Sequence, residues 1–450
     1  MRYFVTCFVV VIFLASTVVT SAKDQLAPNI VFILADDLGY GDLGCYGHPV
    51  AKTPNIDRLA EQGVRFTQHY ANGPECSPTR TAFLTGRYQQ RVGGLECAIG
   101  TGNVGRYDDA IRLAMQRELG LPAERTVIPG ALQPAGYVCS VFGKWHLGYE
   151  PKFNPMEHEW DEFFGYLGGN VHYFNHRETS DLHVLFRGRL PVYRKGYMTH
   201  LITDDSIAFI ERHKERPFFA FISHECPHFP FQGPDDDEKV VTSDNWTALD
   251  AKSYVAMLED LDAEVGRVLK AIDKAGVAEN TVVVFASDNG GFKGAAHMEP
   301  LRGAKSSTFE GGIRVPLIIR WPGRIEPGIV SDQVSATFDL TASFLTLAGA
   351  KTSKDQLDGY DIVHHVAEKR HDFSRTLFWR GRRGDRTWSA VRDGKMKFVR
   401  KVEEGKTQEW LFDLACDIGE QNDLLEENKD TVDHMKQLLA KWESKVESTR

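Results

Sequence analysis

Cys76 and Arg80 are the residues whose types and spacing most clearly suggest chemistry. They lie four residues apart in the segment Cys76-Ser77-Pro78-Thr79-Arg80, and Pro78 fits the first turn of a helix, where a proline loses no hydrogen bond. Residues four apart lie on one face of a helix. The N–H groups and dipole of a helix start favour negative charge at Cys76. A buried thiol beside a surface arginine remains the alternative at this point.

Acidic and amide side chains follow two apolar segments of the chain. Asp36 and Asp37 follow the run 29–34, and Asp288 and Asn289 follow the run 281–286. Both runs are short, continuous and rich in β-branched residues, which predicts buried parallel strands. Open α/β sheets bind ligands at the carboxyl ends of such strands. The oxygen ligands suit Ca²⁺, with Mg²⁺ less favoured in so open a set, although each segment alone also fits a solvated turn.

Basic residues follow other predicted strands. Lys144 and His146 come after the strand expected over 138–142, and His228 comes after the strand expected over 217–222. Lys305 lies in a glycine-rich segment before the strand expected over 315–321. Each of these residues alone would fit an ordinary surface position.

Together these segments resemble the signature blocks of type I sulfatases, in the alkaline phosphatase superfamily. The resembling blocks are Cys-x-Pro-x-Arg followed by Thr-Gly-Arg over 76–87, Gly-Lys-Trp-His-Leu-Gly over 143–148, and the segments 158–166, 227–230 and 301–316. The resemblance covers most of the chain. It implies that a formylglycine-generating maturation enzyme oxidises Cys76 to formylglycine, whose hydrate attacks the sulfur of a sulfate ester.

The resemblance also implies a role for each matching residue. Lys144 and Lys305 would hold the sulfate oxygens, and Arg80 would steady the hydrate. His228, together with Lys305, would protonate the departing alcohol, and His146 would deprotonate the second hydroxyl that expels sulfate. The implied catalytic set is Cys76, Arg80, Lys144, His146, His228 and Lys305, and the implied metal set is Asp36, Asp37, Cys76, Asp288 and Asn289.

Segments between the blocks are expected to line the mouth of the site. They are residues 93–114, 169–177 and 187–195. In addition to Lys144, His228 and Lys305, we expect His172, His176 and Arg177 to bind substrate by contacting sugar hydroxyls or a carboxylate. A basic run at Arg380, Arg382, Arg383 and Arg386 is typical of a solvated loop.

The pattern of elements predicts an α/β fold. We expect a large mixed, mostly parallel sheet flanked by helices, including helices over 53–61, 201–213, 258–272 and 339–347. A catalytic domain over 23–350 is followed by a polar linker at 351–356. Short strands near 376–379, 388–392, 395–400 and 409–412 and a helix over 431–446 predict a smaller antiparallel α+β subdomain over 351–450.

The N-terminus predicts export. Residues 1–22 combine an early Arg2, an apolar run and small residues, as a signal peptide does, with an uncleaved anchor as the alternative. Cleavage would give a periplasmic or secreted protein without a membrane segment. The formal net charge of −9 argues against nucleic acid as a partner.

The sequence as a whole predicts an exported sulfatase that acts on sulfated carbohydrates. Two alternatives stay open: a phosphodiesterase or phosphonate monoester hydrolase of the same superfamily, and a catalytically silent carbohydrate-binding relative. The other mature-chain cysteines have no zinc-like spacing and could form disulfides or remain buried thiols: Cys45, Cys97, Cys139, Cys226 and Cys416.

Overall fold

The computed structural model describes residues 27–350 and 357–447 of the chain. The predicted signal peptide at 1–22 and the predicted linker at 351–356 therefore lie outside the described residues. The division into two domains at residue 350 stays a prediction.

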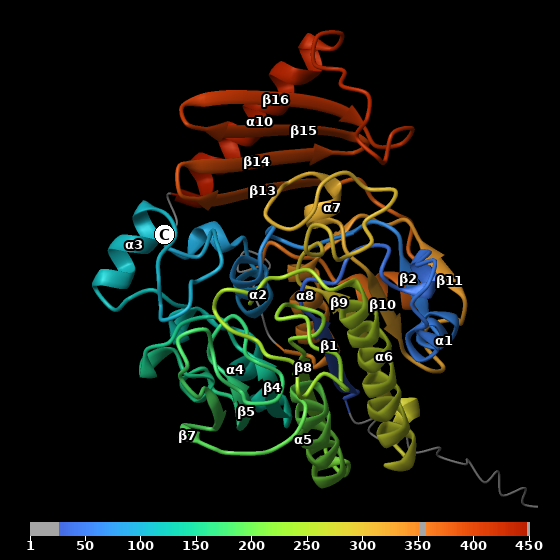
Figure 1. Cartoon of the computed structure of the whole chain (residues 1–450). Coiled ribbons are helices and arrows are strands. Elements are labelled where there is room, and N and C mark those ends of the chain that lie inside the picture. The colour runs from blue at the N-terminus through green and yellow to red at the C-terminus, as the bar shows by residue number, and fades with distance from the viewer. Residues whose placement is uncertain (1–26, 351–356, 448–450) are drawn as a thin grey trace, which may run out of the picture.

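A mixed ten-stranded sheet forms the centre of the molecule (Figure 1). Its central strands β9, β1, β8, β4 and β5 run parallel, and antiparallel pairs extend the sheet on both sides. In spatial order the strands are β11 (Ile329–Ser331), β2 (Val64–Phe66), β10 (Leu317–Arg320), β9 (Thr281–Ser287), β1 (Asn29–Ala35), β8 (Phe218–Ser223), β4 (Val138–Lys144), β5 (Glu162–Tyr166), β6 (Leu185–Arg187) and β7 (Leu190–Pro191).

Helices cover both faces of this sheet, and the alternation of side chains along β1 divides the core between the faces. Ile30 and Phe32 enter one apolar cluster, whereas Val31 and Ile33 enter the other. The first cluster lies under α2 (Cys76–Thr85), α4 (Ile128–Leu132), α8 (Thr337–Leu347) and α9 (Ile362–Ala367). The second lies under α1 (Pro54–Glu61), α5 (Met198–His213) and α6 (Ala251–Lys274). Burial on both faces explains why the central strands are continuous apolar runs.

A four-stranded antiparallel sheet follows in the C-terminal part of the chain, at the top of Figure 1. It consists of β13 (Thr376–Arg383), β14 (Arg386–Asp393), β15 (Met396–Glu403) and β16 (Lys406–Asp413), and α10 (Lys429–Glu447) packs against it. Its apolar residues share one cluster with Tyr70, Tyr88 and Phe338 of the main body. The predicted fold class, with its smaller antiparallel sheet and terminal helix, is confirmed.

The strand β13 corrects the interpretation of the basic run as a solvated loop. Arg380 is buried within this strand, and its guanidinium binds both carboxylate oxygens of Glu96. Arg382 and Arg383 complete the same strand, and Arg386 begins β14. The sequence pattern did not predict a strand over these charged residues, because the partner of the buried Arg380 lies far away in the chain.

The cysteines of the described residues are all free thiols. Cys97, Cys139 and Cys226 are buried, Cys45 is half-buried and Cys416 is exposed. The sequence left disulfides and free thiols as alternatives for these cysteines, and the structure has free thiols. Among the described residues, no helix combines the length and apolar composition needed to cross a bilayer.

Candidate active site

The end of β1 and the end of β9 bring their acidic residues together. Ala35 pairs with Ser287 in the parallel register of these strands, so Asp36 and Asp288 follow side by side. The backbone N–H of Asp37 donates to Asp288 Oδ1 at 3.2 Å, and Asn289 Nδ2 donates to Asp37 Oδ1 at 2.7 Å. All four side chains are buried. The two acidic segments predicted from strand ends thus form one cluster.

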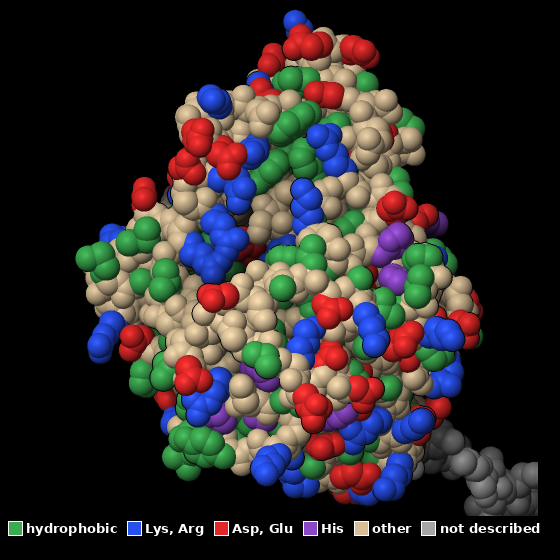
Figure 2. Space-filling view, viewed as in Figure 1, with side chains coloured by type: hydrophobic (Ala, Val, Ile, Leu, Met, Phe, Trp, Pro, Cys, Tyr) green, Lys and Arg blue, Asp and Glu red, His purple; other side chains and the backbone are tan. Residues whose placement is uncertain are grey.

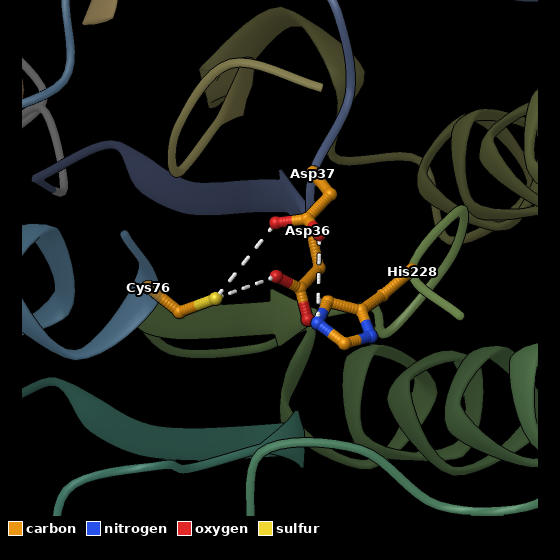
Figure 3. A group of neighbouring side chains, drawn as sticks. All are labelled: Asp36, Asp37, Cys76 and His228. Atoms are coloured by element: carbon orange, nitrogen blue, oxygen red, sulfur yellow. Dashed lines mark hydrogen bonds and ion pairs between the residues drawn. The ribbon is translucent and has the colours of Figure 1, made fainter. Parts of the chain in front are cut away.

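The helix α2 places its first residue, Cys76, against this cluster (Figure 3). Cys76 Sγ lies 3.1 Å from Asp36 Oδ1 and 3.9 Å from Asp37 Oδ1. Burial raises the pKa of the Cys76 thiol well above its usual value, and Asp288 and Asp36 add to this effect. An unmodified thiol in this position is therefore protonated and a poor nucleophile.

Three cations pair with the three carboxylates. Lys144, the last residue of β4, forms an ion pair with Asp36, and Lys305 Nζ lies 2.7 Å from Asp37 Oδ2. Arg80, one turn after Cys76 on α2, binds Asp288 through Nε at 3.0 Å and Nη2 at 2.9 Å. These pairs balance the buried charges one against one.

Burial dominates the electrostatics of Asp36. It raises the pKa of Asp36 to about 7, and Asp288 contributes further to that rise. Burial alone would lower the pKa of Lys144, but Asp36, Cys76 and Asp288 together outweigh burial and raise the pKa. The cluster therefore favours additional positive charge.

The donor set fits a hard divalent cation. Asn289 Oδ1 is buried and has no hydrogen-bond partner among the described residues. Asp36, Asp37, Cys76 and His228 each offer a ligand atom within 4.8 Å of the others, so the group could hold a metal ion. Carboxylate and amide oxygens are the ligands that Ca²⁺ and Mg²⁺ prefer. Asp288 lies beside the group, with Arg80 on its Oδ2.

Two histidines border the cluster, and their hydrogen bonds favour different tautomers. His228 Nδ1 lies 2.7 Å from the Phe229 carbonyl, so Nδ1 carries the proton and Nε2 accepts from Lys305 Nζ at 3.1 Å. His146 Nε2 lies 2.8 Å from the Ile99 carbonyl, which leaves its buried Nδ1 as an acceptor with no hydrogen-bond partner within residues 27–350 and 357–447. Burial, together with Lys305 near His228 and Lys144 near His146, holds both pKa values well below 6.5. Both imidazoles are therefore neutral in this state.

A cavity of about 510 Å³ opens above the cluster. In Figure 2, Lys and Arg side chains gather around the hollow between the C-terminal sheet and the body below it. His146, His228 and Lys305 line the cavity from the catalytic side. Its walls include Ala98, Ile99, Thr101, Arg106, Gly169, Asn170, Trp246, Phe292, Lys293 and Arg383.

The cavity walls agree only partly with the predicted mouth segments. Residues of 93–114 and 169–177 line it, whereas no described residue of 187–195 does. Trp246 and Lys293 carried no recognisable signal, because they come from irregular segments outside the family-like blocks. Arg383 belongs to the basic run, and only the position of β13 brings it to the cavity.

His172, His176 and Arg177 do not line this cavity, so their contact with substrate stays a prediction. His172 Nδ1 accepts from two backbone N–H groups of its own loop, and His176 Nε2 contacts the Gly196 carbonyl at 3.0 Å. Arg177 pairs with Asp181 four residues later. These residues therefore contact both their own loop and more distant segments, including Gln232 Nε2, which lies 3.2 Å from His172 Nε2. Residue type alone could not reveal these contacts.

Comparisons with known proteins show which family this chain resembles. A model of the sulfatase family matches residues 28–350, and one described as N-sulphoglucosamine sulphohydrolase, C-terminal, matches residues 304–447. N-acetylgalactosamine-6-sulfatase of Canis lupus familiaris is 34% identical over 75% of this chain and 65% of its own length. Human (Homo sapiens) arylsulfatase A is 32% identical over 86% of this chain and 78% of its own length.

A solved structure has the same fold throughout. The crystal structure of Ps i-CgsB in complex with k-i-k-neocarrahexaose aligns with a TM-score of 0.81 and 29% identity, covering 93% of each chain. The present chain spans about two thirds of the length of the N-acetylgalactosamine-6-sulfatases it matches, 65% for the canine protein. Because the family match covers the central sheet and every block that builds the cluster, this chain belongs to the sulfatase family.

Proposed function

We propose that this chain hydrolyses sulfate monoesters of sulfated sugars, with residue 76 acting as formylglycine. The observation that carries the proposal is the position of Cys76, whose Sγ lies 3.1 Å from Asp36 Oδ1 and 3.7 Å from Lys305 Nζ beside a cavity. The sugar part is supported by the similar N-acetylgalactosamine-6-sulfatases, whose name gives a sulfated amino sugar as substrate.

Asp36, Asp37, Asp288 and Asn289 would hold a divalent cation, Ca²⁺ before Mg²⁺, together with residue 76. The unpartnered Asn289 Oδ1 and the burial-raised pKa of Asp36 support this assignment. When bound, the cation and the oxidised residue 76 would polarise the sulfate and supply the attacking oxygen. The remaining chemistry falls to side chains of the chain itself.

Lys144 and Lys305 would neutralise the sulfate. A sulfate monoester resists nucleophiles because its anionic oxygens repel them, so the site must offset that charge. The ammonium groups of both lysines face Asp36 and Asp37, and these groups would bind sulfate oxygens when the two carboxylates hold a cation. Arg80 is committed to Asp288, to the Lys144 carbonyl and to Ser223 Oγ, so it would fix the acidic cluster.

Lys305 and His228 would supply the proton for the departing alcohol. Lys305 Nζ donates toward the neutral His228 Nε2 at 3.1 Å, so a proton can move between these two atoms. His146 would act as a base through Nδ1, because its Nε2–H is held by the Ile99 carbonyl. The lowered pKa of His146 keeps this nitrogen unprotonated.

The maturation enzyme would have to act before the fold closes. Cys76 and every other residue of α2 are buried in the folded chain. The segment Cys76-Ser77-Pro78-Thr79-Arg80 can therefore meet an enzyme only while it is unfolded. Export is proposed on the N-terminal sequence alone, and N-terminal sequencing of the mature protein would reveal cleavage near residue 22.

The central test uses protein made together with the maturation enzyme. Mass spectrometry should find formylglycine in the peptide that contains residue 76. Both Cys76→Ala and Cys76→Ser should lower kcat for an aryl sulfate by at least about 10³-fold, because serine cannot form the hydrate. Near-wild-type turnover by Cys76→Ala would overturn the proposal.

Substrate comparison separates this proposal from its two rivals. Turnover of aryl sulfate should exceed turnover of matched phosphomonoesters and phosphodiesters. Predominant phosphodiesterase activity would instead support another hydrolase of the same superfamily. Binding of a sulfated sugar without hydrolysis by fully matured protein would support the catalytically silent alternative.

A further inference from the structure

The cavity of the site continues into a second hollow along the C-terminal sheet. This hollow of about 530 Å³ shares Lys293, Lys305 and Ser306 with the cavity. It then extends to Arg386 and Trp388 at the start of β14. A smaller hollow lined by Ser306, Arg383, Arg386 and Trp388 shares residues with both. We call this smaller hollow and the second hollow together the extended groove.

The extended groove is bordered by cations that are loosely paired. Arg383 lies 3.5 Å from Glu75, and Arg386 lies 3.5 Å from Glu403. By contrast, the buried Arg380 binds Glu96 at 2.7 Å. Longer, partly exposed pairs leave guanidinium N–H groups able to bind a further anion. Lys293, exposed at the junction of the two hollows, adds a third positive charge.

An aromatic side chain forms part of the same wall. Trp388 is partly exposed, and its ring lies edge-on to Phe309 at 5.3 Å and stacks with Trp410 at 6.3 Å. These contacts fix the orientation of the indole. A fixed, partly exposed indole beside cations offers an apolar face to the C–H groups of a sugar ring. The extended groove thus combines an apolar surface for a sugar ring with cationic side chains that can bind an anionic substituent.

We propose that the extended groove binds a sugar unit beyond the one that loses its sulfate, with an anionic substituent at Arg383 and Arg386. The substrate is then an oligosaccharide or polysaccharide with further anionic groups, and not a sulfated monosaccharide. This inference rests on the proposed function, because it takes the cleaved sulfate to lie beside residue 76. The local concentration of cations contrasts with the net charge of −9 of the chain.

The kinetic test compares substrates of different size on variants of the groove. Arg383→Gln, Arg386→Gln and Trp388→Leu are assayed with an aryl sulfate and with a sulfated tetrasaccharide, and Arg58→Gln on the exposed face of α1 is the matched control. Each groove variant should raise KM for the tetrasaccharide by about tenfold or more. Arg386→Gln and Trp388→Leu, which do not line the cavity of the site, should also leave KM for the aryl sulfate within about twofold. Arg58→Gln should change neither value.

Three tetrasaccharides identify the anion. They carry, besides the cleaved sulfate, a second sulfate, a carboxylate or no further charge. A KM increase in the arginine variants for the sulfate or the carboxylate substrate alone names the substituent, and an increase for both means that the groove accepts either. An equal increase for the uncharged substrate, or no increase for any, would overturn the assignment of these arginines.

A binding measurement separates failure of this inference from failure of the proposed function. Calorimetry with Cys76→Ala protein requires no turnover. The charged tetrasaccharide should bind about tenfold more tightly than the sulfated monosaccharide, and Arg386→Gln should remove that difference. Equal affinity for the two sugars would overturn the proposal that the extended groove binds a further sugar unit, even if the enzyme hydrolyses aryl sulfate. Tight tetrasaccharide binding without any hydrolysis would uphold the groove and count against the proposed function.

Discussion

At the scale of single residues, Asn289 distinguishes a cation site from an ordinary acidic cluster. Its Oδ1 is buried without a hydrogen bond among the described residues, while its Nδ2 is held by Asp37. An unpaired buried acceptor costs free energy unless a ligand satisfies it. The fixed amide therefore points to a partner with positive charge.

We expect Asn289→Ala to weaken Ca²⁺ binding at least about tenfold, because it removes one of few oxygen ligands. Titration calorimetry on metal-free protein measures the change directly. The exposed Asn245 supplies the control, and Asn245→Ala should bind Ca²⁺ as the wild type does. Wild-type affinity in Asn289→Ala would remove Asn289 from the metal set.

His146 should act as a base over a wide range of acid pH. We expect His146→Ala to lower kcat by about 10²–10⁴-fold while Ca²⁺ binding is retained. Burial and Lys144 hold the pKa of His146 well below 6.5, so the base stays unprotonated as the pH falls through 6.5. A wild-type kcat profile from pH 5 to 8 should thus show no acid loss centred near 6.5. A loss of wild-type kcat centred near pH 6.5, if it is absent from the residual activity of His146→Ala, would contradict a lowered pKa of His146.

At the scale of elements, a buried charge cluster joins the C-terminal sheet to the loop after Lys305. Lys397 of β15 lies 2.7 Å from Glu310, the first residue of α7 (Glu310–Ile313), and 2.9 Å from Glu420. The three side chains are fully buried. Burial raises the pKa of Glu420 to about 7, and the negative charge of Glu310 adds to this rise, whereas Lys397 opposes it. Glu310 itself is held at about 2, since Lys397, Arg314 and Arg392 together outweigh burial in setting its pKa.

The raised pKa of Glu420 predicts a pH dependence of stability. The folded-state pKa of about 7 exceeds the ordinary glutamate pKa of 4.5, so this group stabilises the fold below pH 4.5 and that contribution is lost as the pH rises through 7. We expect Glu420→Gln, which stays uncharged, to gain up to about 3 kcal/mol relative to the wild type between pH 4.5 and 7.5.

Urea denaturation at pH 5 and at pH 7.5 measures this relative change. The exposed Glu427 provides the control, and Glu427→Gln should follow the wild type at both pH values. The buried lysine is the reason that the wild type tolerates two carboxylates here. A difference between Glu420→Gln and wild type that does not vary with pH would show that Glu420 is ionised throughout.

Prediction from sequence succeeded where local pattern decides structure. The apolar runs of β1, β8 and β9 and the helical stripe of α6 identify themselves, because burial on a sheet face imposes composition and period. The acidic pairs at the ends of β1 and β9 were expected to meet for the same reason. The sequence could not show that β13 extends through Arg383, since the partner of its buried Arg380 is distant in the chain.

At the scale of the whole molecule, the C-terminal sheet is part of the site and not an appendage. Arg383 reaches the cavity from β13, and Trp379 Nε1 donates to the Ala71 carbonyl at 2.8 Å. Cavity walls depend on such long-range docking, which explains why the wall residues were harder to predict than the blocks. The loop that contains His172, His176 and Arg177 has suitable chemistry, but these three residues do not line the cavity, so their role stays a prediction.

The ion pair between Arg380 and Glu96 should carry much of this docking. Arg380 and Glu96 are 2% and 0% exposed, so replacing Arg380 removes the short ion pair of a buried carboxylate, whose pair with Arg382 is longer at 3.7 Å. We expect Arg380→Met to destabilise the protein by about 3–5 kcal/mol, and the double variant with Glu96→Met to recover part of that loss. Urea denaturation followed by tryptophan fluorescence gives these differences.

The nearby Arg386 tests whether burial is the cause. Arg386 and Glu403 are 33% and 38% exposed, so Arg386→Met should cost no more than about 1 kcal/mol. Glu96 lies in the same segment as Ile99, whose carbonyl holds His146 Nε2. Arg380→Met should therefore also lower kcat at temperatures where it is still folded. Equal stability losses in Arg380→Met and Arg386→Met would mean that the docking does not depend on the buried pair.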